Sequence, residues 1–256
     1  MSAQKTSKKI AIEDLLREPY RRILCYPDSN EKEAKKRLRQ LKKLKIDSII
    51  LQGTTEIAGM KILGKGCVSI VVKTKLNGRS LALKIRRVDA NRVSMDREVE
   101  MSTLANSIGI GPKIHAYTKD MIVMDLVSGA DLTTWVRSLN GPGSTLKLRT
   151  ILGLLLKQCF MLDQLGLDHG QLSNLKKHVI VGRKLVILDF ESSSSSRRTS
   201  NVTSSSQYLF VGGPISKRVR RFMRLREYDT IIERLRDYKT NKNEESFVGL
   251  LQQVRL

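Results

Sequence analysis

The chain has 256 residues, and its 47 Lys and Arg residues against 25 Asp and Glu residues give a formal net charge of +22 at pH 7. Forty per cent of the residues are hydrophobic. Because no apolar run approaches the roughly 18 residues of a membrane span, we expect a cytoplasmic protein with no membrane contact. The positive charge predicts attraction to nucleic acid, nucleotides or acidic proteins without choosing among them.

The first predicted element is an amphipathic helix over residues 31–45. Leu38, Leu41 and Leu44 recur at a spacing of three, and most other positions are charged. The basic face indicates either a solvated helix packed on a larger body or a contact with nucleic acid or a partner. We therefore interpret residues 1–55 as a basic helical N-terminal extension.

The pattern changes to strands after this extension. From residue 57 to residue 87, β-branched and aliphatic residues flank a Gly-rich turn and a second turn at Asn77-Gly78, which predicts an antiparallel meander. A helix over about 92–107 follows, and then short strands over 113–117 and 121–124.

The remainder of the chain has a mainly helical pattern. We expect helices over 131–165, a hairpin over 179–189, and one or two basic helices over 213–238. The apolar residues expected to face a core in the last segment are Val219, Phe222, Met223, Leu225, Ile231 and Leu235. A small β-rich part, 56–127, followed by a mostly helical part, 128–256, predicts the α+β class.

Three cysteines, Cys25, Cys67 and Cys159, are odd in number and widely spaced. Their spacing indicates neither a disulfide framework nor a zinc site. We expect all three to be reduced and structural.

The Gly-rich turn is the first candidate for chemistry. Gly64 and Gly66 flank Lys65, and two glycines at this spacing let a backbone approach a polyphosphate. Such turns are common in hairpins, so this signal alone is weak. Eighteen residues after Gly66, Lys84 interrupts an apolar strand. A buried lysine needs an anionic partner, and we expect Glu98 on the following helix to be that partner.

Six short motifs follow one another in the order found in protein kinases. They are Gly64-x-Gly66, Ala82-Leu83-Lys84, Arg97-Glu98-Val99, Val123-Met124-Asp125-Leu126, His169-Gly170-Gln171-Leu172-Ser173 and Leu188-Asp189-Phe190-Glu191. Over about residues 57–240 the chain resembles the compact atypical kinases of archaea, the RIO kinases and the small KEOPS-complex kinase. The resemblance implies a bilobal protein-kinase-like fold, with a small antiparallel-sheet N-lobe and a mostly helical, compact C-lobe.

The resemblance also implies cofactors, ATP and Mg²⁺, and a set of residues that bind them. Lys84, held by Glu98, would contact the α and β phosphates, and Asp189 would bind the metal. The nucleotide-binding residues implied are Gly64, Lys65, Gly66, Lys84, Glu98 and Asp125. The simpler interpretations are a structural salt bridge for Lys84 and Glu98 and a turn residue for Asp189.

The catalytic loop departs from the family pattern at the base. Gln171 stands where these kinases have an aspartate, and an amide can orient a substrate hydroxyl but cannot take its proton. Asp168 and Glu191 are the alternative bases. His169 is interpreted as a residue that braces the loop rather than as a catalyst.

The second metal ligand is also altered. The position of the expected asparagine, five residues after the base, is occupied by Lys176. Asn174 and His178 lie nearby in the sequence, so both are candidate metal ligands beside Asp189.

A Ser-rich loop, 192–206, follows Asp189 and matches an activation segment in position. Its polar composition predicts a mobile loop, at least at its start. Arg197 and Arg198 suit phosphorylation of the neighbouring hydroxyls, either on this loop itself or on a protein substrate; the alternative is a flexible, unmodified loop.

Two functions remain open at this stage. The first is an atypical serine/threonine protein kinase that transfers the γ-phosphate of ATP to itself or to a protein partner, with Gln171 at the usual catalytic position. The second is an ATP-binding pseudokinase or ATPase acting as a basic, RNA-associated scaffold, which contacts RNA or ribonucleoprotein through its basic ends.

Overall fold

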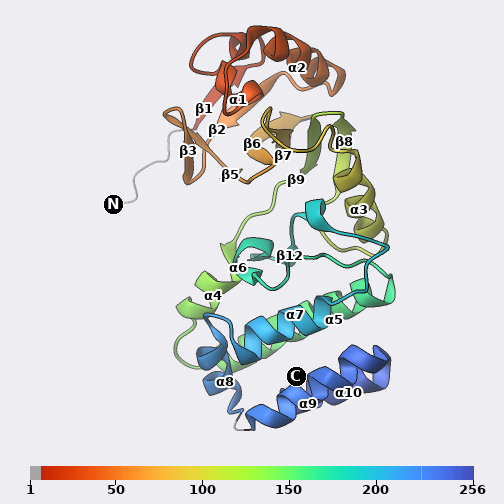
Figure 1. Cartoon of the computed structure of the whole chain (residues 1–256). Helices are drawn as coiled ribbons and strands as arrows, with labels where there is room; N and C mark the ends of the chain where they lie inside the picture. The colour runs from red at the N-terminus through yellow and green to blue at the C-terminus, as the bar shows by residue number, and fades with distance from the viewer. Residues whose placement is uncertain (1–6, 226) are drawn as a thin grey trace. The chain divides into compact units, whose positions relative to one another are not determined.

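The computed structural model describes residues 7–225 and 227–256. The chain divides into two compact units, Met1–Glu100 with Pro112–Leu126 (unit 1) and Met101–Gly111 with Val127–Leu256 (unit 2). Figure 1 traces the helices and strands of each unit. Residues 1–6 of the predicted extension and residue 226 of the predicted basic helices lie outside the described residues. The predicted α+β class is confirmed.

Unit 1 is built on an antiparallel sheet with the strand order β1-β2-β6-β7-β9-β8, and β5 also pairs with β6. Its strands are β1 (Lys8–Ala11), β2 (Ser48–Leu51), β5 (Gly64–Lys65), β6 (Ser69–Leu76), β7 (Arg79–Arg86), β8 (Ile114–Thr118) and β9 (Met121–Asp125). A separate hairpin pairs β3 (Thr55–Ile57) with β4 (Met60–Ile62). Asn77 and Gly78 both have positive φ and join β6 to β7, so the predicted meander and its turn are confirmed.

The N-terminal region differs from the predicted helical extension. Helix α2 (Glu31–Lys43) confirms the predicted helix, and it follows the short helices η1 (Glu13–Leu16) and α1 (Arg21–Cys25). Strands β1 and β2, however, belong to the same sheet as β6, with Ile49 opposite Thr74. Every residue of β2 is buried. Residues 8–51 therefore complete the core of unit 1 instead of extending from it.

A buried carboxylate fastens α2 to this sheet. Asp120, in the turn between β8 and β9, is fully buried and accepts hydrogen bonds from Arg86 Nε at 2.8 Å and Gln40 Nε2 at 2.6 Å. Arg37, also fully buried, lies with its Nη2 3.5 Å from the same carboxylate. Burial raises the pKa of Asp120, but Gln40, Arg86 and Arg37 outweigh burial and lower it. The predicted basic face of α2 thus contains one arginine that is structural.

Unit 2 is mainly helical and packs around the long helix α5. Its helices are α4 (Leu132–Ser138), α5 (Ser144–Gln164), α6 (Leu175–His178), η2 (Phe190–Ser192), α7 (Asn201–Ser206), the π-helix η3 (Gln207–Val211), α8 (Ser216–Met223), α9 (Tyr228–Asn241) and α10 (Glu244–Gln253). Helix α3 (Asp96–Ser107) contributes its first turn to unit 1 and the rest to unit 2. A small antiparallel sheet has the order β10 (Ala130–Asp131), β11 (Val179–Val181), β12 (Leu185–Ile187).

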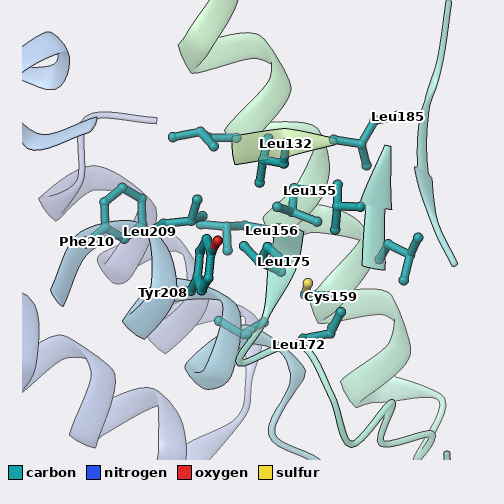
Figure 2. Packing of buried hydrophobic residues seen from close by; sticks show 14 of the residues in the cluster. Leu132, Leu155, Leu156, Cys159, Leu172, Leu175, Leu185, Tyr208, Leu209 and Phe210 are labelled. Carbon is teal, nitrogen blue, oxygen red and sulfur yellow. The ribbon is translucent and has the colours of Figure 1, made fainter. Parts of the chain in front are cut away.

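The core of unit 2 confirms the predicted apolar faces. Figure 2 shows Leu155, Leu156 and Cys159 of α5 among buried side chains from η3, the loop that contains Leu172, and β12. In the basic C-terminal helices, the predicted core residues are buried or partly buried: Val219, Phe222, Met223, Leu225, Ile231 and Leu235. No helix within 7–225 and 227–256 is long and apolar enough to cross a membrane.

The cysteine prediction holds for two of the three residues. Cys25 and Cys159 are buried free thiols, and burial raises the pKa of Cys159 to about 12. Cys67 is a free thiol too, but it is exposed in the Gly-rich turn, so packing gives it no structural role.

The end of the Ser-rich segment is a packed helix rather than the predicted loop, while residues 193–200 form no helix or strand. Residues 201–206 form α7, and Ser205 and Ser206 are fully buried. Asp163 of α5 holds the start of this helix, because its carboxylate accepts from the backbone and side-chain nitrogens of Asn201 at 3.0 and 2.8 Å. The Tyr238 hydroxyl donates to the same carboxylate at 2.9 Å. Asn201 and Ser205 are buried with their side-chain hydrogen bonds satisfied within the protein, whereas the buried Ser206 hydroxyl has no hydrogen-bond partner among the described residues.

Candidate functional site

Lys84 and Glu98 form a buried ion pair within unit 1. Lys84 lies in β7 opposite Ile122 of β9, and Glu98 lies in the first turn of α3. The Lys84 Nζ is 2.5 Å from Glu98 Oε1, and the side chains are 5% and 6% exposed. A charged hydrogen bond at this distance fixes the position of the ammonium group. The predicted pairing of these two residues is therefore present.

The Gly-rich turn begins in β5, where Gly64 pairs with Val71 of β6. Lys65, Gly66 and Cys67 are exposed, and the Gly66 nitrogen donates to the Ser69 carbonyl at 2.8 Å. Neither glycine has a positive φ. A Cβ added at Gly64 would meet no atom of the described chain within 4 Å, and one at Gly66 would meet only the Ser69 oxygen, at 3.6 Å. The fold of unit 1 thus does not itself require glycine at either position.

Two residues that the sequence did not single out hold this turn in place. Arg87 donates from Nη1 to the Gly66 carbonyl at 2.9 Å and pairs with Asp89 at 2.6 Å. Both cations lie over the Tyr26 ring, with Lys65 Nζ 5.6 Å and the Arg87 guanidinium 5.1 Å from its centroid. No local pattern in the sequence connects Tyr26 to the turn, because the contact joins residues about 40 positions apart.

Asp125 is engaged by a neighbour on its own sheet. It ends β9, and its Oδ1 lies 2.7 Å from Nε2 of His115 on β8. Its backbone nitrogen donates to the Lys113 carbonyl at 3.0 Å. These contacts fix the strand end that the resemblance assigns to nucleotide binding.

The loop that carries Gln171 is braced by His169 in unit 2. The fully buried His169 donates from Nε2 to the Leu188 carbonyl at 2.9 Å, and its backbone nitrogen donates to Asn201 Oδ1 at 2.9 Å. Burial lowers the pKa of His169 to about 4, so the ring is neutral at pH 7. Gln171 is partly exposed, and its buried Oε1 has no hydrogen-bond partner among the described residues.

Asp168 is not available as a substitute base. It is 2% exposed, its Oδ2 accepts from Arg197 Nε at 2.6 Å, and its Oδ1 accepts from the backbone nitrogen and the hydroxyl of Ser200 at 2.8 and 3.0 Å. These bonds stabilise the charged carboxylate and occupy both oxygens. The alternative base that remains in unit 2 is Glu191.

At the end of the β11–β12 hairpin, the backbone of His178 lies beside Leu188, the residue before Asp189. Val179 pairs with Ile187, and the Leu188 nitrogen donates to the His178 carbonyl at 2.8 Å. Asp189 follows directly, with φ of 69° in the left-handed region that residues other than glycine adopt rarely. Holding a residue there costs about 1–3 kcal/mol, a strain typical of functional positions.

The groups at this hairpin end fit a divalent cation. Carboxylate oxygens of Asp189 and Glu191 lie within 4.8 Å of each other, and carboxylates are the ligands that Mg²⁺ and Mn²⁺ accept. The predicted ligand His178 is not brought together with both carboxylates, because no ring nitrogen of it lies within 4.8 Å of the two; its Nδ1 is buried and has no hydrogen-bond partner in the described part of the chain. Asn174, the other predicted ligand, is exposed at the N-cap of α6 and makes no side-chain cap bond.

Comparison with known proteins adds one similarity. No family model matches the chain. The chain is similar to the uncharacterized protein MJ1211 of Methanocaldococcus jannaschii, with 28% identity over 97 residues that make up 38% of this chain and 80% of that protein. This similarity assigns no activity to the chain.

Proposed function

We propose that the chain has a bilobal protein-kinase-like fold, with unit 1 as the N-lobe and unit 2 as the C-lobe. In this proposal it is an atypical serine/threonine protein kinase that uses ATP and Mg²⁺ and phosphorylates itself or a protein partner. The observation that carries the proposal is the Lys84–Glu98 pair.

A buried ion pair is a poor device for stability alone. Removing two charges from water costs several kcal/mol per ion, and apolar residues of similar volume often do as well or better. A lysine fixed by a carboxylate is instead suited to phosphate binding, because its ammonium group is already held in position before the negatively charged phosphate binds. The 2.5 Å distance and the burial of both side chains support this role for Lys84.

The two glycines of the turn support the same role. Because unit 1 does not need glycine at positions 64 and 66, their lack of side chains is best explained by a molecule that approaches the backbone from outside. Arg87 and Tyr26 hold the turn in one place. We propose that this turn covers the phosphates of the bound nucleotide.

Unit 2 contributes the metal ligand and the loop that meets the acceptor hydroxyl. Asp189 would hold Mg²⁺, which neutralises phosphate charge when bound. Gln171 orients the hydroxyl through its amide, and the loss of a base at this position costs on the order of 10²–10⁴-fold in rate. A loose transition state makes positioning and charge neutralisation the larger contributions, so transfer is slow but retained.

The test is incorporation of label from γ-labelled ATP with Mg²⁺ into the purified protein or an added protein substrate. We expect slow transfer in the wild type and none in Lys84→Ala and Asp189→Ala. Matched controls are Lys61→Ala and Asp229→Ala, since both residues are exposed. Label in the wild type no greater than in Lys84→Ala would overturn the proposal.

A second candidate, an ATP-binding pseudokinase or ATPase serving as a basic, RNA-associated scaffold, is favoured by Gln171 itself. The amide cannot accept the proton of a hydroxyl. This candidate predicts ATP binding that depends on Lys84 without labelled protein, and released phosphate only if the chain is an ATPase. A gain of protein labelling in Gln171→Asp would show that the amide limits transfer and would favour the kinase.

A further inference from the structure

A pocket of about 370 Å³ lies within unit 2, at the packed helices α9 and α10. Figure 1 shows these two helices side by side, and their Tyr238 and Phe247 rings have centroids 6.1 Å apart. The pocket is lined by Leu225, Glu227, Arg234, Gly249, Gln252, Gln253 and Arg255. Its volume is near the lower end of the range for small-molecule sites, about 300–1,000 Å³. The pocket shares no residue with the proposed kinase site, so its ligand would be a second one.

The charge of the lining favours an anion. Arg234 and Arg255 outnumber the single carboxylate of the lining, Glu227. Within residues 7–225 and 227–256, neither arginine forms an ion pair with a carboxylate. A guanidinium group presents a rigid set of N–H donors that matches the oxygens of a phosphate two at a time. The net charge of +22 also raises the local concentration of anions. A phosphate group is therefore the anion that matches this lining best.

Gly249 leaves the wall of the pocket on α10 without a side chain. It lies inside the helix, where glycine is among the least favourable residues, and its φ is not positive. A Cβ at this position would lie 3.7 Å from Nη1 of Arg234, which is an ordinary contact. The fold thus tolerates a larger residue here. The glycine instead leaves bare backbone beside the Arg234 guanidinium, and a ligand bound to that guanidinium would use the space.

The carboxylate of the lining belongs to a fixed chain of polar groups. Gln253 donates from Nε2 to the Thr230 hydroxyl at 2.6 Å, and this hydroxyl donates to the Glu227 carbonyl at 3.1 Å. The Glu227 carboxylate lies 3.5 Å from the same hydroxyl. An ionised carboxylate only accepts hydrogen bonds, so it requires N–H or O–H groups on a ligand. A ligand with a phosphate at one end and such donors at the other matches both charges of the pocket.

We propose that this pocket binds a small phosphate ester of nucleoside monophosphate size. Arg234 and Arg255 bind the phosphate, and Glu227 accepts from the N–H or O–H groups of the ester. The volume of about 370 Å³ suits a compact ligand of this size. The inference goes beyond the proposed function and does not depend on it, because all of its residues belong to the α9–α10 part of unit 2.

The experiment is calorimetric titration of the full-length protein, without metal, with cytidine 5′-monophosphate (CMP). This probe carries a phosphate, ribose hydroxyls and an amino group, and its two parts, cytidine and inorganic phosphate, are titrated separately. We expect a dissociation constant below about 1 mM for CMP and affinities at least about tenfold weaker for each part. The CMP affinity of Lys84→Ala should stay within about threefold of the wild type, since Lys84 belongs to the proposed nucleotide site of unit 1.

Substitutions in the lining test the two ends of the ligand separately. Arg234→Gln and Arg255→Gln should each weaken CMP binding at least about tenfold, because each removes a charged bidentate donor. Glu227→Gln should weaken CMP binding but not the binding of inorganic phosphate. Arg236→Gln is the matched control, since Arg236 is exposed on the same helix α9 and lies outside the lining. Circular dichroism and thermal unfolding show whether each variant is folded.

Two helix glycines separate space for a ligand from a structural role. Gly153 lies inside α5, and a Cβ there would meet no atom of the described chain within 4 Å. Gly249→Ala and Gly153→Ala should both raise the urea midpoint of unfolding, because alanine is favoured in helices. Only Gly249→Ala should weaken CMP binding. A lower midpoint with unchanged CMP affinity in Gly249→Ala would show that this glycine serves packing and would contradict its role in the pocket.

The remaining outcomes are decisive for the pocket itself. A wild type that does not bind CMP, or that binds inorganic phosphate equally well, would overturn the proposal. Folded Arg234→Gln and Arg255→Gln proteins with wild-type affinity would do the same. CMP binding that is lost in Lys84→Ala and retained in Arg234→Gln would place the probe at the proposed kinase site instead. Absence of labelling in the kinase assay concerns the proposed function alone and leaves this inference standing.

Discussion

Arg197 donates from Nε to Oδ2 of Asp168 at 2.6 Å, so the Ser-rich segment is tied to the residue that precedes His169. Ser200 donates twice to the other oxygen of the same carboxylate. Asp168 therefore couples the position of the Gln171 loop to the fold of the segment 192–206. Anything that opens this contact should affect both.

The variant Asp168→Asn tests this coupling through stability. It removes the charge from a buried acceptor of three hydrogen bonds, and bonds to charged groups contribute about 1.5–3 kcal/mol. We expect the free energy of unfolding to fall by about 2–3 kcal/mol in urea titrations. Arg183→Ala, at an exposed arginine of unit 2, is the control and should change it by less than about 0.5 kcal/mol. An unchanged midpoint in Asp168→Asn would show that these contacts do not stabilise unit 2.

Variants of the Lys84–Glu98 ion pair can distinguish its contribution to stability from its contribution to nucleotide binding. Lys84→Met leaves Glu98 buried without its cation, and such a loss costs about 3–5 kcal/mol. The double variant Lys84→Met with Glu98→Leu should recover most of that stability because no isolated charge remains. Nucleotide binding, measured by calorimetry, should stay absent in both. A double variant that is stable and still binds ATP as the wild type does would contradict the assignment of Lys84.

The glycines of the turn make a matched comparison with Gly170. Gly64→Ala and Gly66→Ala add a methyl group where unit 1 leaves space, so the melting temperature should stay within about 2 °C of the wild type. ATP affinity should fall by at least tenfold. Gly170 has φ of 81°, and a Cβ there would lie 2.8 Å from the Ser192 carbonyl. Gly170→Ala should therefore lower the melting temperature. Equal effects of all three changes on stability would contradict the proposed use of Gly64 and Gly66.

The free energy of unfolding of unit 2 should fall at acid pH because His169 is buried in its neutral form. Burial lowers the pKa of His169 from 6.5 to about 4 in the folded protein. Between these values the unfolded chain binds a proton that the folded protein does not, so stability is complete above pH 6.5 and is lost as the pH falls toward 4. Each pH unit in this window corresponds to about 1.4 kcal/mol.

Between pH 7 and pH 5 the loss due to His169 should be about 2 kcal/mol. His169→Gln keeps a donor for the Leu188 carbonyl and removes the titration. Urea unfolding at the two pH values should therefore give a smaller acid-induced loss for this variant than for the wild type, and an equal loss would contradict the assignment. His178, whose pKa is also lowered by burial, acts in the same direction.

If the chain phosphorylates itself, burial limits where the phosphate is added. Ser195 and Ser196 are exposed, whereas Thr199, Ser205 and Ser206 are buried. We expect tandem mass spectrometry, after incubation with ATP and metal, to find phosphate on Ser195 or Ser196. The Ser195→Ala, Ser196→Ala double variant should lose it. Phosphate on Ser205 would require α7 to unfold and would contradict this expectation.

Several features could be predicted because their causes are local in the sequence. The Asn77-Gly78 turn follows from two residues that tolerate positive φ, and the buried faces of α8 and α9 follow from helical spacing. The pairing of Lys84 with Glu98 followed from one charge in an apolar strand and one acid in the next helix. Each inference needed only neighbouring residues.

Other features depend on partners that are distant in the sequence. The Ser-rich segment has a disordered composition, yet it packs because Asp163, 38 residues before Asn201, accepts its hydrogen bonds. Composition shows how polar a segment is, but it does not show whether its polar groups form hydrogen bonds in the folded protein. Strand β2 could not be predicted for a similar reason: four residues carry little pattern, and the partner of Ile49, Thr74, lies beyond the three intervening strands β3, β4 and β5.

The place of β2 between β1 and β6 has a consequence during synthesis of the chain. When residue 51 has left the ribosome, β2 can pair with β1, but its other edge stays open until β6 is complete at Leu76. At about 5–20 residues per second, this interval lasts roughly 1–5 s. An open edge of a buried apolar strand is a site along which chains associate. A fragment that stops before residue 69 would keep that edge permanently, and aggregation of such fragments is the expected result.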